Sequence, residues 1–329
     1  MKRAAIILIL FSWQRAIHAQ DLEFSQFFNA SLYLNPAFAG ADIGPRFALN
    51  YRNEWAGLGN AYISYAASYD QHFDALDGGI GVLVVSDQQA NGIYVGNSAT
   101  GVYSYQINLS KKFTLQAAAS VAVVQKRIQN DKLIFAENIN PNDGSIISSG
   151  SIDLPDRPSR TFPDFGAGFL FFTQKTFFGF SVKHLTSPNE SLLSAQNSPL
   201  AYRLAGNFGV EFHSKSTKKI PLFFSPNIFL ASQSKFKQLT FGAILGIGVF
   251  YGGFSYRTTF TNADAIIVMT GLQKGVFKFG YSFDATVSGL KGNTSGSHEL
   301  SLVFNFHDSE KVLKKQHTKK TWQCPPRVF

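Results

Sequence analysis

The chain of 329 residues is poor in charge, cysteine and long apolar runs. Charged residues make up 16% of it, against about 25% in an average soluble domain, which argues against a disordered chain or a charged coiled coil. The single cysteine, Cys324, excludes an internal disulfide framework. No long apolar block follows the N-terminus, so a bundle of membrane-spanning helices is excluded as well. What the chain has instead is 33 Phe, 12 Tyr and 28 Gly, and enough length for one large all-β unit.

The N-terminus has the pattern of an export signal. Lys2 and Arg3 precede an apolar run over residues 4–13, and the small residue Ala19 lies where a signal peptidase can cut. We therefore predict that residues 1–19 are a signal peptide and that the mature chain begins at Gln20. Loss of the signal peptide lowers the formal net charge from +9 to +6.

Most of the remaining positive charge lies at the other end of the chain. Residues 307–329 hold six basic and two acidic residues, so the body, residues 20–306, is close to neutral. A high isoelectric point often indicates nucleic-acid binding. Here the charge lies in a tail that we expect to be exported, which argues against nucleic acid as a partner.

The body alternates between apolar and polar residues with a period of two. In residues 277–287, Phe279, Tyr281 and Phe283 share one face, while Lys278 and Asp284 lie on the other. Similar segments cover most of the body, and a helical period explains none of them better. The pattern predicts fourteen β-strands, at residues 46–54, 61–70, 78–87, 97–109, 112–126, 163–173, 176–184, 201–213, 221–233, 236–247, 249–259, 264–272, 275–287 and 297–306.

Two architectures fit such strands, a soluble β-sandwich and an outer-membrane β-barrel. Many segments reach about ten residues, the length that crosses a bilayer at a tilt, whereas sandwich strands average five or six. The apolar face carries no charge, and Lys or Arg at the bilayer midplane costs about 2–4 kcal/mol. We therefore predict a transmembrane barrel of about 14 antiparallel strands in outer-membrane lipid, with a polar, Gly- and Ser-rich interior. Alternate connections are short, as periplasmic turns are, which supports an even strand number with both ends in the periplasm.

Several motifs, taken in order, resemble one protein family. Leu34-Asn35-Pro36-Ala37-Phe38-Ala39-Gly40 and Tyr51-Arg52-Asn53-Glu54-Trp55 are similar to the opening signature of the PorP/SprF family of the type IX secretion system. Later motifs follow in the family's order: Ser68-Tyr69-Asp70, Gly252-Gly253-Phe254-Ser255-Tyr256-Arg257, Gly280-Tyr281-Ser282-Phe283-Asp284 and Gly296-Ser297-His298-Glu299-Leu300. The ending Cys324-Pro325-Pro326-Arg327-Val328-Phe329 resembles a Cys-Pro-Arg-Phe terminus of the gliding-associated branch, from which Pro326 and Val328 depart.

The resemblance implies a function that the alternating pattern does not. It implies a bacterial outer-membrane protein of Bacteroidota that works with the secretion and gliding machinery. Its expected partners are that machinery and a secreted cargo or adhesin with a C-terminal sorting domain.

Charged residues of both signs fall on the face that we expect to line the lumen. A network of ion pairs that fills and rigidifies a narrow lumen is one interpretation, because charges in low dielectric persist only when paired. The other is that Arg52, Arg257, Asp284 and Glu299 hold a loop or a partner segment at the lumen mouth. Glu54 belongs to the same set of candidate residues. The predicted lumen residues are Arg46, Arg52, Glu54, Asp70, Asp164, Lys183, Arg203, Glu211, Arg257, Lys278, Asp284 and Glu299.

Two further features have a structural and a functional interpretation. Trp55 follows the first strand and is either an interfacial anchor or a recognition residue. The basic tail is either a solvated segment or a periplasmic docking segment with Trp322 and Phe329 as apolar anchors. The motif resemblance, through Cys324, Pro325 and Arg327, favours docking.

Enzyme signatures are lacking in the sequence. We find no nucleophile elbow, no His-Glu-x-x-His motif and no Cys-x-x-Cys pair. His184 and His298 are far apart in the sequence, and we interpret each as a lone histidine. We therefore expect no catalytic residue, cofactor or metal. The sequence predicts a non-enzymatic component of type IX secretion that binds cargo or links the barrel to periplasmic machinery. The alternatives are a passive or hydrophobic-solute channel and a purely structural anchor.

Overall fold

A computed structural model describes residues 20–42, 44–59, 61–135, 139–146, 156–214, 221–289, 292, 294–306 and 325. The predicted signal peptide and, except for Pro325, the predicted tail lie outside these residues. The strands are β1 (Arg46–Glu54), β2 (Tyr62–Phe73), β3 (Gly78–Gln89), β4 (Tyr94–Asn108), β5 (Thr114–Ile128), β6 (Ser159–Phe172), β7 (Thr176–Lys183), β8 (Arg203–Val210), β9 (Phe212–His213), β10 (Leu222–Gln233), β11 (Phe236–Ile247), β12 (Phe250–Thr258), β13 (Ala263–Lys274), β14 (Phe277–Thr286) and β15 (Ser297–Asn305).

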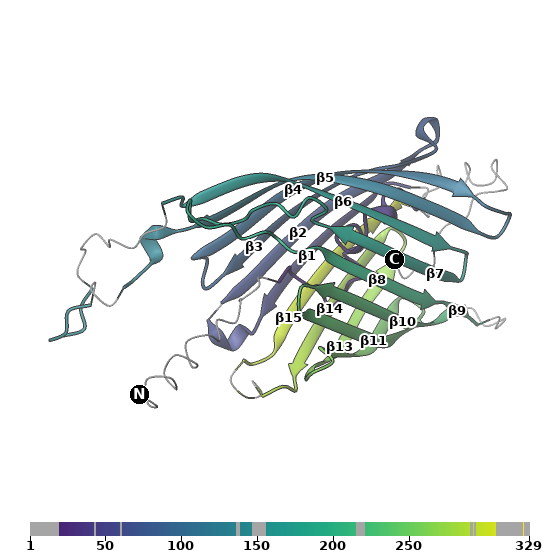
Figure 1. Ribbon diagram of the computed structural model, residues 1–329. Helices are drawn as coiled ribbons and strands as arrows, with labels where there is room; N and C mark the ends of the chain where they lie inside the picture. Colours follow the sequence, from purple (N-terminus) through teal and green to yellow (C-terminus); the bar gives the residue numbers. More distant parts are fainter. Residues whose placement is uncertain are drawn as a thin grey trace, which may run out of the picture.

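These strands form a closed antiparallel barrel (Figure 1). Each strand pairs with its sequence neighbours, and β1 pairs with β15. β8 and β9 are one strand interrupted at Glu211, because both pair with β10. The wall therefore has fourteen strand positions, and the predicted outer-membrane β-barrel is confirmed. In the described part of the chain, no helix has both the length and the apolar character needed to cross a bilayer.

The alternation places apolar side chains outside and charged ones inside. In β1, Phe47 and Leu49 are 46% and 50% exposed, whereas Asn50 and Arg52 are 5% and 1% exposed. A row of exposed apolar side chains is stable only where lipid covers it, since a monomer in water rarely shows so large an apolar surface. The outer face is therefore the lipid-facing one.

The two ends of the barrel differ in the length of their connections. At one end, here called the turn end, short connections such as residues 173–175, 248–249 and 275–276 join the strands. The other, the loop end, carries the longer connections from β5 to β6 and from β7 to β8. In Figure 1 the loop end lies at the left, and β9 marks the turn end at the right. In bacterial outer-membrane barrels the short turns face the periplasm.

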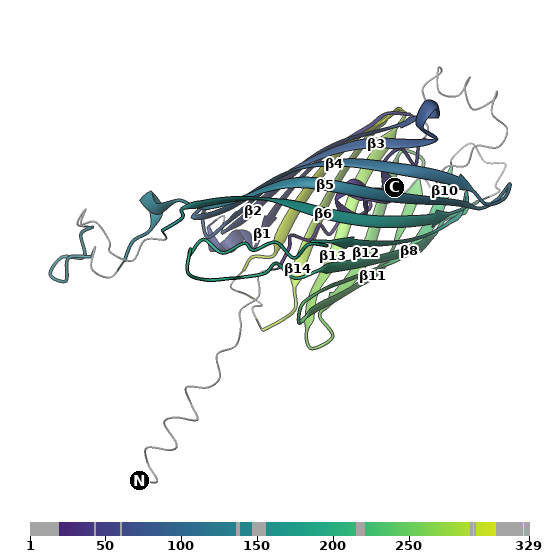
Figure 2. The same cartoon turned by 45° about the horizontal axis from the view of Figure 1, so that its top comes forward.

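Residues 20–42, which precede the first strand, lie inside the barrel; we call them the plug segment. The segment enters near the loop end and leaves near the turn end, and it appears in purple within the barrel in both views (Figures 1 and 2). It contains a short helix α2 (Ser31–Leu34) and a 3-10 turn η1 (Pro36–Phe38). Asn35 caps η1, since its side-chain oxygen accepts a hydrogen bond from the amide of Ala37 at 2.9 Å.

The plug segment changes the expected character of the lumen. Phe27, Phe28 and Phe38 are at most 4% exposed and pack with the inward-facing Phe177 and Phe229 of the wall. The rings of Phe27 and Phe229 stack at a centroid distance of 5.3 Å. The polar, Gly- and Ser-rich interior that the sequence predicts therefore accounts for only part of the lumen. One side of the lumen is an apolar core, because an apolar inner segment needs apolar wall residues to bury it.

Candidate functional site: the lumen and its plug

The residues singled out from the motifs meet at one place in the lumen. Arg52 in β1 lies opposite Glu299 in β15, and their closest side-chain atoms are 3.2 Å apart. Arg52 Nη2 and Arg257 Nη1 each lie 3.0 Å from Asp284 Oδ2. We call Arg52, Arg257, Asp284 and Glu299 the lumen cluster; all four are at most 6% exposed.

The lumen cluster holds the plug segment. Ser25 Oγ donates to Asp284 Oδ2 at 2.6 Å and accepts hydrogen bonds from both arginines, at 2.8 Å from Arg52 and 3.0 Å from Arg257. The Glu299 carboxylate accepts from the backbone amides of Ser25 and Gln26, at 2.7 and 2.8 Å. Two arginines and two carboxylates are therefore joined through one hydroxyl and two amides of the plug segment.

The charges of the lumen cluster are balanced, which is what their burial requires. A buried ion pair is stable only when each charge has a partner and its remaining polar atoms form hydrogen bonds. At the edge of the cluster, Glu54 lies 3.4 Å from Arg52, and Asp264 pairs with Arg257. The structure thus contains elements of both interpretations of these residues. The ion pairs are present, and they hold a segment at the lumen, which here belongs to the same chain.

A second set of polar contacts holds the start of the plug segment. His184, at the loop end of β7, lies between two carboxylates: its Nε2 is 2.8 Å from Asp21 and its Nδ1 is 2.9 Å from Asp164. Burial favours the neutral ring, but the attraction of Asp21 and the hydrogen bonds that the ring donates to Asp164 and Asp21 raise the pKa of His184 to about 9. The interpretation of His184 as a lone histidine was therefore wrong. Nearby, Glu23 accepts from Arg203 Nε at 3.1 Å.

The plug contacts were missed because nothing in their local sequence marks them. Ser25 and Gln26 lie in a segment without a strand pattern, and Asp21 is far from His184 in the chain. The predicted lumen charges, six basic and six acidic, balance one another, so they gave no signal that partners from outside the strands were needed.

Trp55 lies at the loop end and not in the lumen cluster. Its backbone is left-handed, with φ of 56°, and its amide donates to Ser297 Oγ at 3.2 Å. Its ring meets that of Tyr62 edge to face, at a centroid distance of 5.4 Å. Together with Glu54 and Asp264 it lines a cavity of about 330 Å³, which we call the loop-end vestibule.

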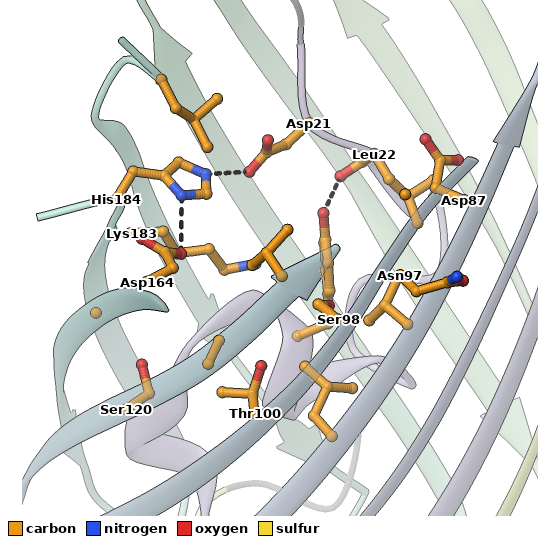
Figure 3. A pocket seen from close by; sticks show the side chains of 18 of the residues that line it. Asp21, Leu22, Asp87, Asn97, Ser98, Thr100, Ser120, Asp164, Lys183 and His184 are labelled. Atoms are coloured by element: carbon orange, nitrogen blue, oxygen red, sulfur yellow. Dashed lines mark hydrogen bonds and ion pairs between the residues drawn. The ribbon is translucent and has the colours of Figure 1, made fainter. Parts of the chain in front are cut away.

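A smaller cavity lies between the plug segment and the wall of β3–β7. It has a volume of about 150 Å³ and mostly apolar walls, including Leu22, Leu83 and Val102. Figure 3 shows Asp21, His184 and Asp164 at its edge, joined by dashed lines. Lys183 also lines it, and its Nζ lies 3.6 Å from the centre of the Tyr33 ring. This arrangement can hold an apolar group of about the size of benzene.

Of the predicted tail residues only Pro325 is described, and it is buried. Trp322, Cys324, Arg327 and Phe329 lie outside the described residues.

Among the comparisons with known proteins, the one with protein families agrees with the motifs. No curated protein matches the chain. Among solved structures, a Pseudomonas aeruginosa FadL homologue is 13% identical, with a TM-score of 0.39, over 85% of this chain and 94% of that one. A double mutant of Rh. blastica porin is 8% identical, with a TM-score of 0.32, over 80% of this chain and 98% of the porin. The family described as type IX secretion system membrane protein PorP/SprF matches residues 16–304. The match covers the plug segment, the lumen cluster and nearly all of the barrel, and the chain therefore belongs to the PorP/SprF family.

Proposed function

We propose that the protein is a non-enzymatic outer-membrane docking component of type IX secretion. It binds a secreted cargo or adhesin with a C-terminal sorting domain, or it links the barrel to periplasmic machinery. The observation that supports docking over conduction is the plug segment, which fills the lumen and is bound by the lumen cluster at Ser25 and Gln26.

The loop-end vestibule is the part of the barrel that we assign to a partner. Glu54 and Asp264 at its edge are 33% and 30% exposed, so they offer negative charge outside the buried cluster. Trp55 and Tyr62 add an aromatic wall. Buried aromatic anchors flanked by charge are typical of binding hot spots. A partner segment with basic and apolar side chains fits this surface.

The test is capture of partners from native membranes with the tagged protein. We expect Trp55→Ala to lower the yield of captured cargo severalfold, because the aromatic wall is lost. Phe260→Ala is the matched control, since Phe260 is a 62% exposed aromatic of the loop end that does not line the vestibule. Equal capture by both variants, or unchanged surface cargo in a deletion strain, would contradict the proposal.

A hydrophobic-solute channel is the second candidate, and the cavity of about 150 Å³ beside Leu22 favours it. Liposomes with the purified protein separate the two functions. A channel admits apolar solutes or ions into the liposomes. A docking component leaves the permeability of the liposomes unchanged, and it co-purifies with its partners from native membranes.

A further inference from the structure

A second large cavity opens at the turn end of the barrel. This turn-end pocket has a volume of about 480 Å³ and lies among the ends of β9–β13. Its walls are mainly apolar and aromatic, with Leu222, Phe223 and Tyr251 among the lining residues. Val249 and Phe250, also in the lining, are 41% and 67% exposed. The pocket is therefore an apolar recess that is accessible from the turn end.

The turn-end pocket contains one buried carboxylate. Glu211 interrupts the wall strand between β8 and β9, and its side chain is 1% exposed. His213, which is 52% exposed, brings its Nε2 to 2.6 Å from Glu211 Oε1. An apolar recess with a carboxylate at its base suits a segment that carries both cationic and apolar side chains.

The basic tail begins at the edge of this pocket. The amide of Asn305, at the end of β15, donates to the carbonyl of Val276 at 2.7 Å, and the neighbouring Gly275 lines the pocket. Residues 307–329 follow directly, with six basic and two acidic residues. At about 3.3 Å per extended residue, this length exceeds what is needed to reach the pocket.

One described residue of the tail is buried. Pro325 is buried, although it follows the end of β15 by 20 residues. Pro325 lies between Cys324 and Arg327. The buried position therefore falls in the part of the tail that carries the cation Arg327 and the aromatic residues Trp322 and Phe329.

We propose that the C-terminal tail of the chain docks in the turn-end pocket of its own barrel. Arg327 lies toward the Glu211 carboxylate, and the apolar side chains of the tail pack against Leu222, Phe223 and Phe250. This inference goes beyond the proposed function and does not depend on it.

Disulfide trapping tests the docking, because Cys324 is the single cysteine of the chain. In Val249→Cys the new thiol lies in the lining of the pocket. Under mild oxidation we expect a link from position 249 to Cys324 within one chain, identified by mass spectrometry of the linked peptide. Lys112→Cys is the matched control, since its turn between β4 and β5 lies at the same end but across the barrel from β11 and β12. We expect at least about tenfold less linking there, because a disulfide requires the two Cα atoms within about 7 Å.

Three outcomes would overturn the proposal. The first is equal linking at both positions. The second is no linking at either position in chains whose heat-dependent gel mobility shows that they are folded. The third is a link between two chains only, which would place the tail on a second copy. Phe250→Cys gives the same test if Val249→Cys does not fold.

Charge variants then test the role of Arg327. We expect Arg327→Gln in the Val249→Cys background to lower the yield of the link severalfold, because the tail loses the cation that pairs with Glu211. Lys311→Gln is the control, since it removes the same charge near the start of the tail. An equal yield in both variants would exclude recognition of Arg327 by the pocket.

Discussion

At the residue scale, Asp284 is the side chain on which the lumen cluster depends most. Its Oδ2 accepts from Ser25 and lies 3.0 Å from both arginines, so one atom joins two cations to the plug segment. Arg52 and Arg257 both carry positive charge in a buried place, and Asp284 compensates them. Their mutual repulsion would otherwise act in a low dielectric.

Removal of Asp284 therefore leaves two buried cations with less compensation. We expect Asp284→Ala to lower the free energy of unfolding by about 3–5 kcal/mol, measured by denaturant unfolding in detergent micelles. Arg257→Ala is expected to destabilise the barrel as well. Glu54→Ala is the control, because its carboxylate is 33% exposed and such pairs contribute only about 0–1 kcal/mol. Equal stability of Asp284→Ala and the control would show that the cluster does not hold the barrel together.

His184 gives the protein a stability that depends on pH. Its pKa is raised from 6.5 to about 9 in the folded protein, so its contribution is fully present below pH 6.5 and is lost as the pH rises through about 9. We expect the unfolding temperature in detergent to fall across this window, and His184→Gln to remove that part of the pH dependence. If the unfolding temperature of His184→Gln falls equally across this window, the pH dependence arises from other groups.

At the scale of the element, the plug segment is held where it leaves the barrel as well as by its contacts in the lumen. Gly40 has a left-handed φ of 61°, and its amide donates to Asp70 Oδ1 at 3.0 Å. A Cβ atom at Gly40 would lie 2.6 Å from the Cα of Gly79, which is backbone of β3 and cannot move aside. Only glycine allows the segment to approach the wall so closely.

Two glycine variants separate this close approach from backbone strain alone. We expect Gly59→Ala to cost about 1 kcal/mol of stability, because Gly59 has a φ of 68° but no atom within 4 Å of its Cβ position. We expect Gly40→Ala to cost about 2–3 kcal/mol, since strain and collision add. Denaturant unfolding of both variants measures the difference, and an equal cost would mean that the plug segment is not held tightly against β3.

The wall strands could be predicted from the sequence, whereas the plug segment could not. A period of two identifies a strand with one lipid face regardless of its partners, so β1 and β11 were predicted with their observed bounds. The predicted strand at 201–213 missed the interruption at Glu211, because a break in the pairing leaves the alternation unchanged. Residues 20–42 form contacts that are specified by the closed barrel, such as Phe27 with Phe229, and no local pattern encodes them. The four residues of the lumen cluster were predicted to line the lumen. Ser25, to which they bind, was not predicted.

At the scale of the whole molecule, the barrel is a closed wall around an occupied lumen. The apolar packing around Phe27 and Phe38 and the polar contacts of Ser25 and Asp21 lie along the same segment. The plug segment is thus held at several points between the loop end and the turn end. A segment held along this length narrows the lumen between the two ends.

We expect the reconstituted protein to conduct ions weakly, and deletion of residues 21–38 to raise the conductance, because the deletion removes the part of the plug segment that packs in the lumen. Planar bilayer recording with matched protein amounts measures both. Ser25→Ala provides a comparison that keeps the plug segment and loses only the hydrogen bonds of one hydroxyl, to Asp284, Arg52 and Arg257. High conductance of the unmodified protein, or no increase on deletion, would contradict an occluding role.

The pairing of β1 with β15 has a consequence for assembly. Arg52 comes from the first strand and Glu299 from the last, and they meet only where the two ends of the wall join. Glu299 on that last strand also accepts the hydrogen bonds from the amides of Ser25 and Gln26. The contacts of Ser25 and Gln26 with Glu299, although they belong to the first described part of the chain, can thus form only after the final hairpin has been added. An incomplete barrel would lack this attachment of the inner segment, which links full occlusion of the pore to completion of folding.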